Sequence, residues 1–375
     1  MDADPDYKSL LVKLEKEHRI KINEFIGKGS YSQVMKGIAN NKLKIAVKII
    51  DTRVKSEYVR RFLPREMELV RNLKHECVLR VYQVVDISHY AIFITEYCDG
   101  GDLLQKIKKM KRVPEAEAKI LFRQFIEALI YLQRCSIVHR DLKCENVFLD
   151  KYENVKLGDF GFARYLKPNE KANTFCGSRA YVAPEILRAI AYTGQTVDIW
   201  SAGIVLYVMV TGVMPYDDRN PQKMVERQLG HRIRFPKIDI SVQVKTLIYE
   251  ILHPYPPSRP TYKAICNSDW LRNTAYSLKG VDIWSAGIVL YVMVTGVMPY
   301  DDRNPQKMVE RQLGHRIRFP KIDISVQVKT LIYEILHPYP PSRPTYKAIC
   351  NSDWLRNTAY SLKGNRDASI TQGSS

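Results

Sequence analysis

The stretch IVHRDLKCENVFLD, Ile137–Asp150, carries the most specific motif of this sequence. Two further motifs follow it in order: KLGDFGFAR, whose Asp159 stands 18 positions after Asp141 (159 − 141), and TFCGSRAYVAPE at residues 174–185. Any one of these motifs could occur by chance, and an isolated aspartate in it would be read as a helix cap or a turn residue. Their order and spacing together predict a single functional site.

The segments before this stretch predict strands first and then a helix. Residues 21–27, 32–39 and 44–50 are short and rich in β-branched residues, which favours strands. Residues 115–133 instead carry apolar residues at every third or fourth position, as one face of a helix requires. This part of the sequence therefore predicts both strands and helix.

The turn GKGSYSQV, residues 27–34, joins the first two predicted strands. Glycine permits a tight turn and lets backbone N–H groups approach phosphate oxygens, as a nucleotide-binding loop requires. Gly27 and Gly29 would equally fit an ordinary hairpin, and Ser32 stands where the pattern GxGxxGxV has its third glycine. On its own this loop is weak support for a nucleotide site.

Lys48 lies in the third predicted strand between the apolar residues Val47 and Ile49. A lysine in such a strand most often points from a sheet edge to solvent. The segment LPREMELV, residues 63–70, predicts a helix start that offers the Glu66 carboxylate to this lysine. Such a pair would keep a partly buried ammonium charged and hold it against phosphates.

Together these motifs resemble the eukaryotic protein kinases. The resemblance implies an α+β, bilobal fold, with a small β-rich lobe at residues 20–97, a larger helical lobe at residues 98–272 and an N-terminal extension at residues 1–19. It also implies that ATP and Mg²⁺ are the cofactors and that a protein hydroxyl is the acceptor. The lysine of HRDLKCEN points to Ser or Thr as that acceptor.

The same resemblance assigns roles to the residues of the motifs. Asp141 would accept the proton of the attacking hydroxyl, and Lys143 would steady the γ-phosphate. Asn146 and Asp159 would hold Mg²⁺, which prefers oxygen ligands. The nucleotide-binding residues would be Gly27, Gly29, Lys48 and Glu66, with Val34, Ala46 and Phe148 around the adenine, the backbone of Glu96 and Cys98 as the hinge, and Thr95 as the gatekeeper.

Five further residues would regulate or support this site. Arg140 offers a guanidinium fork to a phosphate that an upstream kinase would add to Thr174, which would order the activation loop. Otherwise Thr174 is an exposed loop hydroxyl. Asp198 would hydrogen-bond the backbone of the catalytic loop. Arg259 would pair with Glu185 and fasten the end of the activation segment.

Longer segments, among them FLPREMELV, DFGFAR and MPYDD, resemble the testis-specific serine/threonine kinases over residues 20–271. That branch implies a role in spermatogenesis and reliance on a heat-shock chaperone. Asp102 and Glu145 match acidic positions that receive arginines upstream of the target residue, although either could be an ordinary surface carboxylate. Two residues depart from the family pattern. Ser32 should loosen the phosphate lid, and Arg179, which stands where a proline is usual, should alter substrate choice.

The segment VDIWSAGIVLYVMVTG begins at Val197 and begins again at Val281, and the identity continues through SLKG. Residues 197–280 and 281–364, which we name copy one and copy two, are therefore one segment of 84 residues (281 − 197) in tandem. Copy one completes the kinase, whereas copy two has no glycine loop, hinge, HRD or DFG motif of its own. Copy two is expected to be helical, not independently folded, and not a second kinase.

Either copy could pack against the front half of the chain, because their sequences are identical. They differ only in the length of chain that links them to it. Docking copy two would insert 84 residues into the connection after Thr196, at a loop-closure cost of about 2 to 3 kcal/mol, so copy one is expected to win. The other copy then exposes an apolar helix, which implies aggregation, chaperone dependence, a swapped dimer or a covering partner. Such complete identity indicates a very recent in-frame duplication or an error in assembling the gene, and we favour the error.

The composition is that of a soluble globular protein, with 45% hydrophobic and 26% charged residues. The seven cysteines show neither a CxxC pair nor metal-ligand spacing, and the N-terminus MDADPDYK does not resemble a secretory signal. We therefore expect a cytoplasmic protein with reduced thiols. The longest apolar run, residues 202–214, is too short to span a membrane. The tail at residues 365–375 is polar and expected to be disordered.

The net charge of +18 raises the hypothesis of nucleic-acid binding. The densest basic run, residues 106–112, has no interleaved aromatic residues and is better explained as the solvated face of a helix. The leading hypothesis is therefore an active serine/threonine kinase with protein substrates and no specific affinity for nucleic acid or membrane. The rival hypothesis is a kinase-shaped scaffold that copy two has inactivated.

Overall fold

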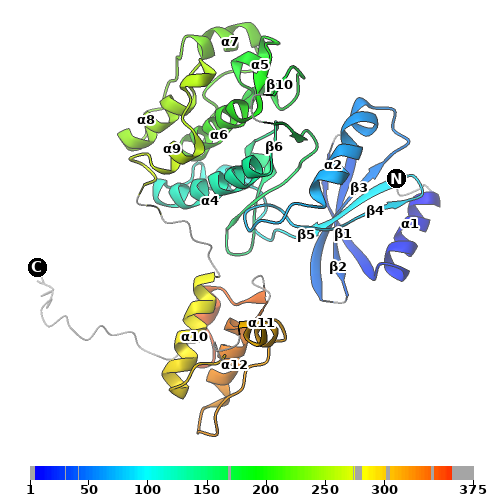
Figure 1. Ribbon diagram of the computed structural model, residues 1–375, viewed down its shortest axis with the longest axis vertical. Helices are drawn as coiled ribbons and strands as arrows, with labels where there is room; N and C mark the ends of the chain where they lie inside the picture. Colours follow the sequence, from blue (N-terminus) through cyan, green and yellow to red (C-terminus); the bar gives the residue numbers. More distant parts are fainter. Residues whose placement is uncertain are drawn as a thin grey trace, which may run out of the picture. The chain divides into compact units, whose positions relative to one another are not determined.

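The computed structural model describes residues 5–29, 31–40, 42–167, 170–272, 274, 281–300, 305–338 and 342–356. The chain divides into two compact units, Met1–Ser277 and Leu278–Ser375 (Figure 1). The motif residues named above all lie in the first unit, and the tail predicted to be disordered lies outside the described residues. In the described part of the chain, no helix is both long and apolar enough to cross a membrane.

The N-terminal part of the first unit is a five-stranded antiparallel sheet. Its strands are β1 (Ile20–Lys28), β2 (Ser32–Ala39), β3 (Leu43–Asp51), β4 (Val81–Ile87) and β5 (Tyr90–Glu96), in the order β1-β2-β3-β5-β4. The three strands predicted from β-branched residues are therefore confirmed. The register sets Val34 opposite Lys48 and Ala46 opposite Thr95, so residues of the predicted nucleotide site meet on neighbouring strands.

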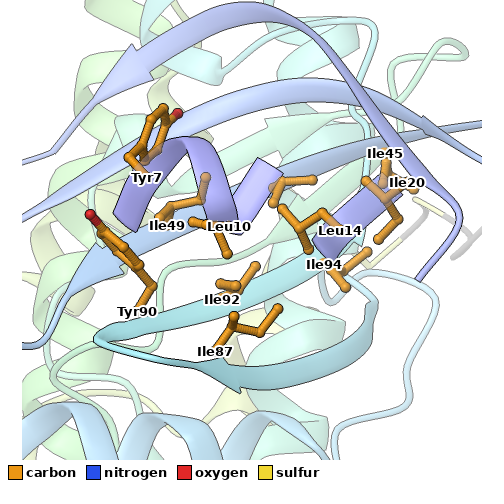
Figure 2. Close-up of a cluster of buried hydrophobic side chains, with 11 residues drawn as sticks. Tyr7, Leu10, Leu14, Ile20, Ile45, Ile49, Ile87, Tyr90, Ile92 and Ile94 are labelled. Atoms are coloured by element: carbon orange, nitrogen blue, oxygen red, sulfur yellow. The ribbon is translucent and has the colours of Figure 1, made fainter. Parts of the chain in front are cut away.

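Helix α1 (Pro5–Lys16) packs on one face of this sheet (Figure 2). Its Tyr7, Leu10 and Leu14 are buried, and their spacing places them on one side of the helix. They meet a layer of strand residues: Ile20, Ile45, Val47, Ile49, Ile87, Tyr90, Ile92 and Ile94. Because strand side chains alternate between faces, Lys48 points to the opposite face. The N-terminal extension is thus part of the small lobe's core, which was not predicted from the sequence.

The rest of the first unit is mainly helical. Helix α2 (Leu63–Val70) lies between β3 and β4 in the chain, and the helices after the sheet are α3 (Leu103–Met110), α4 (Glu115–Arg134), α5 (Pro184–Leu187), α6 (Gly194–Thr211), α7 (Pro221–Leu229), α8 (Val242–Ile251) and α9 (Tyr262–Cys266). Helix α6 is buried over nearly its whole length, because α3, α4 and α8 all pack against it. A helix that is apolar nearly all round needs neighbours of this kind on every side.

Three short antiparallel strand pairs position the loops of the site. They are β6 (Ile137–Val138) with β9 (Arg164–Tyr165), β7 (Val147–Leu149) with β8 (Val155–Leu157), and β10 (Lys171–Ala172) with β11 (Tyr192–Thr193). Strand β6 leads into the loop that carries Asp141, and β8 ends two residues before Asp159. The pairs therefore bring two motifs that are separate in the sequence to adjoining loops.

The second unit contains copy two. Its helices α10 (Val281–Thr295), α11 (Pro305–Leu313), α12 (Val326–Ile335) and α13 (Tyr346–Cys350) repeat the repeated part of α6 and then α7, α8 and α9, each 84 positions later (281 − 197). Their buried cluster comprises Tyr291, Tyr300, Ile317, Ile324, Val328, Ile332 and Leu336. The described residues of this unit are mainly helical and have a small apolar cluster of their own.

Candidate active site

Asp141 is the centre of a buried hydrogen-bond network. Lys143 Nζ donates to its Oδ2 at 3.0 Å, and the N–H and Oγ of Ser178 donate to its Oδ1 at 2.8 and 2.9 Å. The Nδ2 of Asn146 donates to the Asp141 carbonyl at 2.9 Å. These contacts hold the carboxylate in one orientation, as a positioned proton acceptor requires.

Lys48 is held between two carboxylates. Its Nζ lies 3.0 Å from Glu66 Oε1 and 3.1 Å from Asp159 Oδ1. Burial alone would lower the pKa of Lys48, but the charges of Asp159 and Glu66 outweigh it and raise the pKa. The pair of Lys48 with Glu66 expected from the sequence is therefore present, and the ammonium stays charged.

Asp159 and Asn146 carry the oxygens expected to hold Mg²⁺. The Lys48 ammonium holds the pKa of the Asp159 carboxyl below its ordinary value, so this carboxylate is charged at neutral pH. Asn146 is buried, and its amide nitrogen is engaged by the Asp141 carbonyl, which leaves its Oδ1 as a ligand atom. A charged carboxylate and an amide oxygen are ligands that Mg²⁺ accepts, so these residues fit the ion.

The glycine loop closes on its own backbone. The N–H of Gly29 donates to the Ser32 carbonyl at 2.8 Å, and a Cβ at Gly29 would lie 2.6 Å from the Ser32 Oγ. Gly27 stands opposite Val34 in the β1-β2 register. Ser32, which replaces the third glycine of the pattern, is therefore accommodated because Gly29 has no side chain.

The predicted hinge follows β5. Thr95 Oγ1 donates to the Glu96 carbonyl at 3.1 Å, and the Glu96 carboxylate pairs with Lys156 Nζ at 3.2 Å. Phe148 stands opposite Lys156 in the β7-β8 pair, so this hairpin brings the predicted adenine contact towards the hinge. The carbonyl of Cys98 accepts from the N–H of Gly101 at 3.2 Å, which tightens the turn at the start of the large lobe.

Asp198 fastens the catalytic loop to α6. Its Oδ2 accepts from the N–H of His139 at 2.7 Å, and its Oδ1 accepts from the N–H of Arg140 at 2.9 Å. Burial raises the pKa of Asp198, although these hydrogen bonds and the neighbouring positive charges oppose the rise. The contact predicted for this aspartate is therefore observed.

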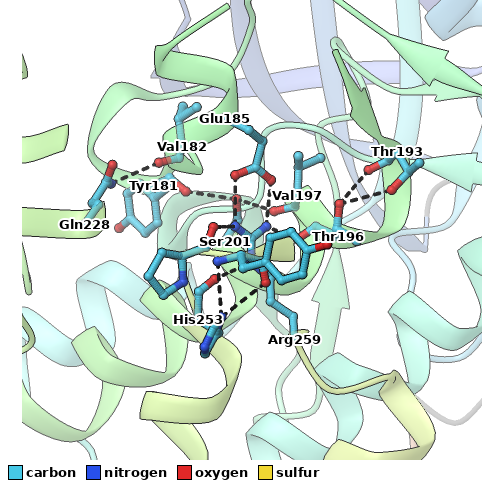
Figure 3. A network of polar contacts seen from close by, with 12 residues as sticks. Tyr181, Val182, Glu185, Thr193, Thr196, Val197, Ser201, Gln228, His253 and Arg259 are labelled. Atoms are coloured by element: carbon cyan, nitrogen blue, oxygen red, sulfur yellow. Dashed lines mark hydrogen bonds and ion pairs between the residues drawn. The ribbon is translucent and has the colours of Figure 1, made fainter. Parts of the chain in front are cut away.

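Arg259 joins the end of the activation segment to the helical lobe (Figure 3). Its Nη1 and Nη2 donate to the two carboxylate oxygens of Glu185 at 2.7 and 2.9 Å, and Nη1 also donates to the Thr196 carbonyl at 2.8 Å. The guanidinium lies 4.9 Å from the centre of the Trp200 ring. This two-pronged ion pair is the one expected from the sequence, and burial strengthens its hydrogen bonds.

Comparison with known proteins agrees with this geometry. The family model for the protein kinase domain matches residues 20–271, and a second match covers residues 269–355. The testis-specific serine/threonine-protein kinase 2 of Mus musculus is 42% identical over 256 residues, which cover 66% of this chain and 72% of that protein. The chain belongs to the protein kinase family.

Two further relatives narrow the class of this kinase. The testis-specific serine/threonine-protein kinase 1 of Homo sapiens is 38% identical over 70% of the chain and 74% of that protein. The serine/threonine-protein kinase SIK3 homolog of Danio rerio is 36% identical over 66% of the chain and 21% of that protein. The chain is a serine/threonine protein kinase related to the testis-specific kinases, and the predicted bilobal fold is confirmed.

Arg140 of this kinase is buried in a positively charged environment. Its Nε donates to the Phe162 carbonyl at 2.8 Å, while its two terminal nitrogens have no hydrogen-bond partner among the described residues. Burial, with the charges of Arg140 and Arg164, lowers the pKa of Arg65 on α2. Three guanidinium groups from separate elements therefore gather here, which is an arrangement suited to an anion. The predicted phosphate acceptor Thr174 is half-buried in the same activation segment.

Asp102 has a structural role that the sequence did not reveal. Its Oδ1 accepts from the Gln105 N–H at 2.8 Å, so it caps the N-terminus of α3. Burial raises the pKa of Asp102, and the nearby charge of Glu145 adds to the rise. Glu145 itself is exposed. The two carboxylates predicted to receive substrate arginines are thus close enough to interact.

Two residues of the site were not predicted from the sequence. Ser178, which holds Asp141, follows Gly177, whose φ of 99° turns the chain towards the catalytic loop. Tyr58 donates a short hydrogen bond to Glu66 and stacks on Tyr31 with ring centres 5.3 Å apart. The hydroxyl residue directly after TFCG could have indicated the role of Ser178, whereas nothing in the sequence indicated that of Tyr58.

Proposed function

We propose that this kinase is catalytically active and transfers the γ-phosphate of ATP to Ser or Thr residues of proteins. The observation that supports the proposal is the network around Asp141, in which Lys143 and Asn146 each donate a hydrogen bond to this proton acceptor. The Lys48 ammonium pairs with Glu66 and also with Asp159, and so connects Glu66 to the same site. No charged group that the chemistry requires has been replaced.

Each side chain has a distinct task in this proposal. Asp141 accepts the proton of the substrate hydroxyl, while Lys143 on its other oxygen opposes the negative charge of the transferred group. Lys48 holds the phosphates of ATP, and Asn146 with Asp159 holds Mg²⁺. Bound Mg²⁺ would shield the phosphate charge. Because the hydrogen bonds already fix these groups, little reorganisation is needed when substrate binds.

Transfer of labelled γ-phosphate to a basic serine peptide tests this proposal. The full chain should label the peptide, and Asp141→Asn should reduce kcat by about a thousandfold or more because the proton acceptor is lost. Asp269→Asn is the matched control, since that carboxylate is exposed and its ion pair among the described residues is with the neighbouring Arg272. Soluble, ATP-binding protein that transfers no phosphate would instead support the rival scaffold.

A preference for arginine upstream of the target residue is supported by Asp102 and Glu145. Asparagine caps a helix as well as aspartate does, so Asp102→Asn removes the charge and keeps the cap of α3. Asp102→Asn and Glu145→Gln should each raise KM for an arginine-containing peptide by about three- to tenfold with little change for its alanine analogue. Equal changes for both peptides would rule out recognition of the arginine.

The cluster at Arg140 supports activation by an upstream kinase that phosphorylates Thr174. Thr174→Ala and Arg140→Ala should each lower activity, and the double variant should be no worse than Arg140→Ala, because both act through one contact. Full activity of protein without phosphate would exclude this regulation. We further propose a cytoplasmic location, with which the free cysteines of the described chain are consistent, and a role in spermatogenesis, which rests on the similarity to testis-specific kinases. A heat-shock chaperone as partner remains an expectation from the family resemblance.

A further inference from the structure

The internal contacts of copy one are reproduced in copy two. Trp200 stacks on Tyr216 with ring centres 6.2 Å apart, and Trp284 stacks on Tyr300 at 6.1 Å. The N-caps are reproduced as well, since Ser241 and Ser325 each accept from the N–H three residues later. Copy two is therefore folded internally in the form that copy one has when it completes the large lobe.

The outward face of the repeated helix differs between the copies. Val205 and Met209 on α6 are 0% and 1% exposed, whereas their equivalents Val289 and Met293 on α10 are 57% and 76% exposed. These residues are four positions apart and so lie on one helix face. Copy two thus presents to solvent the apolar face that copy one buries.

Copy one shows what covers this face. The N–H of Val113 donates to the Met209 carbonyl at 2.8 Å, and α3 and α4 pack on α6. A Cβ at Gly212 would lie 1.9 Å from the Lys111 carbonyl, whereas a Cβ at Gly296 would meet no described atom within 4 Å. The surface that fits α10 is therefore the large-lobe segment from α3 to residue 196 of this same chain.

We propose that copy two is a replacement for copy one, able to dock on this large-lobe segment of its own chain and complete the same active site. The docking residues are identical in the two copies, and only the first turn of α6, residues 194–196, lies outside the repeat. Connectivity favours copy one by about fiftyfold, so copy two docks in a small fraction of molecules. Damage to the docking face of copy one reverses this balance.

Met209→Asp is the variant that tests the exchange. It places a charge in the packed face of copy one, which disfavours docking by more than about a hundredfold, but the equivalent position is largely exposed in the undocked copy. The substitution therefore breaks docking without breaking the copy's own fold. Met293→Asp is the matched control, and the variant with both substitutions has no intact docking face.

Phosphotransfer by the full chain is the first readout, and it rests on the proposed kinase activity. Met209→Asp should stay within about threefold of the parent, Met293→Asp should equal the parent, and the double variant should lose more than about a hundredfold. Loss of activity in Met209→Asp equal to that of the double variant would overturn the exchange. Activity of Met209→Asp that rises with protein concentration would overturn docking within one chain and assign it to a second copy of the chain.

Amide hydrogen exchange is the second readout and does not depend on activity. In Met209→Asp the peptides around positions 209 and 293 differ in mass, so the two copies are distinguishable. Slow exchange should move to the peptide that contains Met293, and the peptide that contains the aspartate should exchange fast. Fast exchange in both peptides would overturn the proposal. If the parent chain is inactive but Met209→Asp still moves slow exchange to the peptide that contains Met293, the proposed kinase activity is wrong and the exchange of copies stands.

Discussion

Copy one and copy two have one sequence and two different surroundings. Each copy forms the same helices, the same stack of Trp on Tyr and the same serine caps. They differ where copy one meets residues that precede the repeat: Trp270 is 2% exposed, while Trp354 is 37% exposed. This segment therefore determines its internal contacts by itself, whereas the burial of its outward face depends on a partner that occurs once in the chain.

Glu115 is an example of such a partner. Its carboxylate accepts from Ser241 Oγ at 2.6 Å and from Trp270 Nε1 at 2.7 Å. Both donors have equivalents in copy two, Ser325 and Trp354, but a second Glu115 does not exist. The front half of the chain can therefore complete one copy at a time.

Glu185→Ala should have the largest effect on stability, because neither copy can replace this residue. It leaves the Arg259 guanidinium buried without its carboxylate, and breaking such a pair costs about 3–5 kcal/mol. Urea unfolding followed by hydrogen exchange of the catalytic-loop peptide, which occurs once in the chain, measures this loss. Glu250→Ala removes an exposed carboxylate and should change stability by less than about 0.5 kcal/mol. Equal losses of unfolding free energy in the two variants would mean that the buried ion pair stabilises the fold no more than an exposed carboxylate does.

Trp270→Ala should have the next largest effect on stability, and its size shows whether copy two can replace copy one. Removing a buried tryptophan costs about 3–5 kcal/mol, but docking of copy two limits the loss to the loop-closure cost of about 2–3 kcal/mol. Trp354→Ala alone should cost less than about 1 kcal/mol in the first unit. The variant with both substitutions should show the full loss. The same unfolding experiment detects this, and a single variant as unstable as the double variant would contradict it.

The fold was predictable wherever one segment carried its own signal. The strands around Lys48, the α2 carboxylate that meets it and the contact of Asp198 with the catalytic loop all came from local pattern and family motifs. Helix α1 was missed because its three buried residues become recognisable only when the sheet face they cover is known. Ser178 and the cap at Asp102 were missed for the same reason, since each contact joins elements that are distant in the sequence or depends on where a helix begins.

Ser241→Ala and Ser325→Ala should separate a helix cap from a contact between segments. Both substitutions remove a cap worth about 1 kcal/mol, and Ser241→Ala also removes the hydrogen bond of its hydroxyl to Glu115, worth about 1 kcal/mol more. We expect the first unit to lose about 2 kcal/mol in Ser241→Ala and less than about 0.5 kcal/mol in Ser325→Ala. The loss is too small to favour exchange of the copies. Similar losses in both variants would show that the Glu115 contact adds nothing.

Glu115 should give the smallest effect, a dependence on pH that copy one has and copy two lacks. Burial alone would raise the pKa of Glu115, but hydrogen bonds from Ser241 and Trp270 outweigh it and lower the pKa below the ordinary value of 4.5. A carboxyl group with a lowered pKa in the folded state stabilises it above the ordinary pKa, and this contribution is lost as the pH falls through the folded-state pKa.

The residue is partly exposed, so solvent screening should keep this contribution below about 1 kcal/mol. The catalytic-loop peptide should therefore unfold at lower urea as the pH falls from 6 to about 3.5, and Glu115→Gln should flatten part of this dependence. Comparing the two pH profiles removes the titration of all other groups, which the variants share. If the profiles are parallel, the Glu115 carboxylate stabilises the docked copy no better than a neutral amide, and the difference between the two copies rests on the other contacts of copy one, among them the packing around Trp270 and Met209.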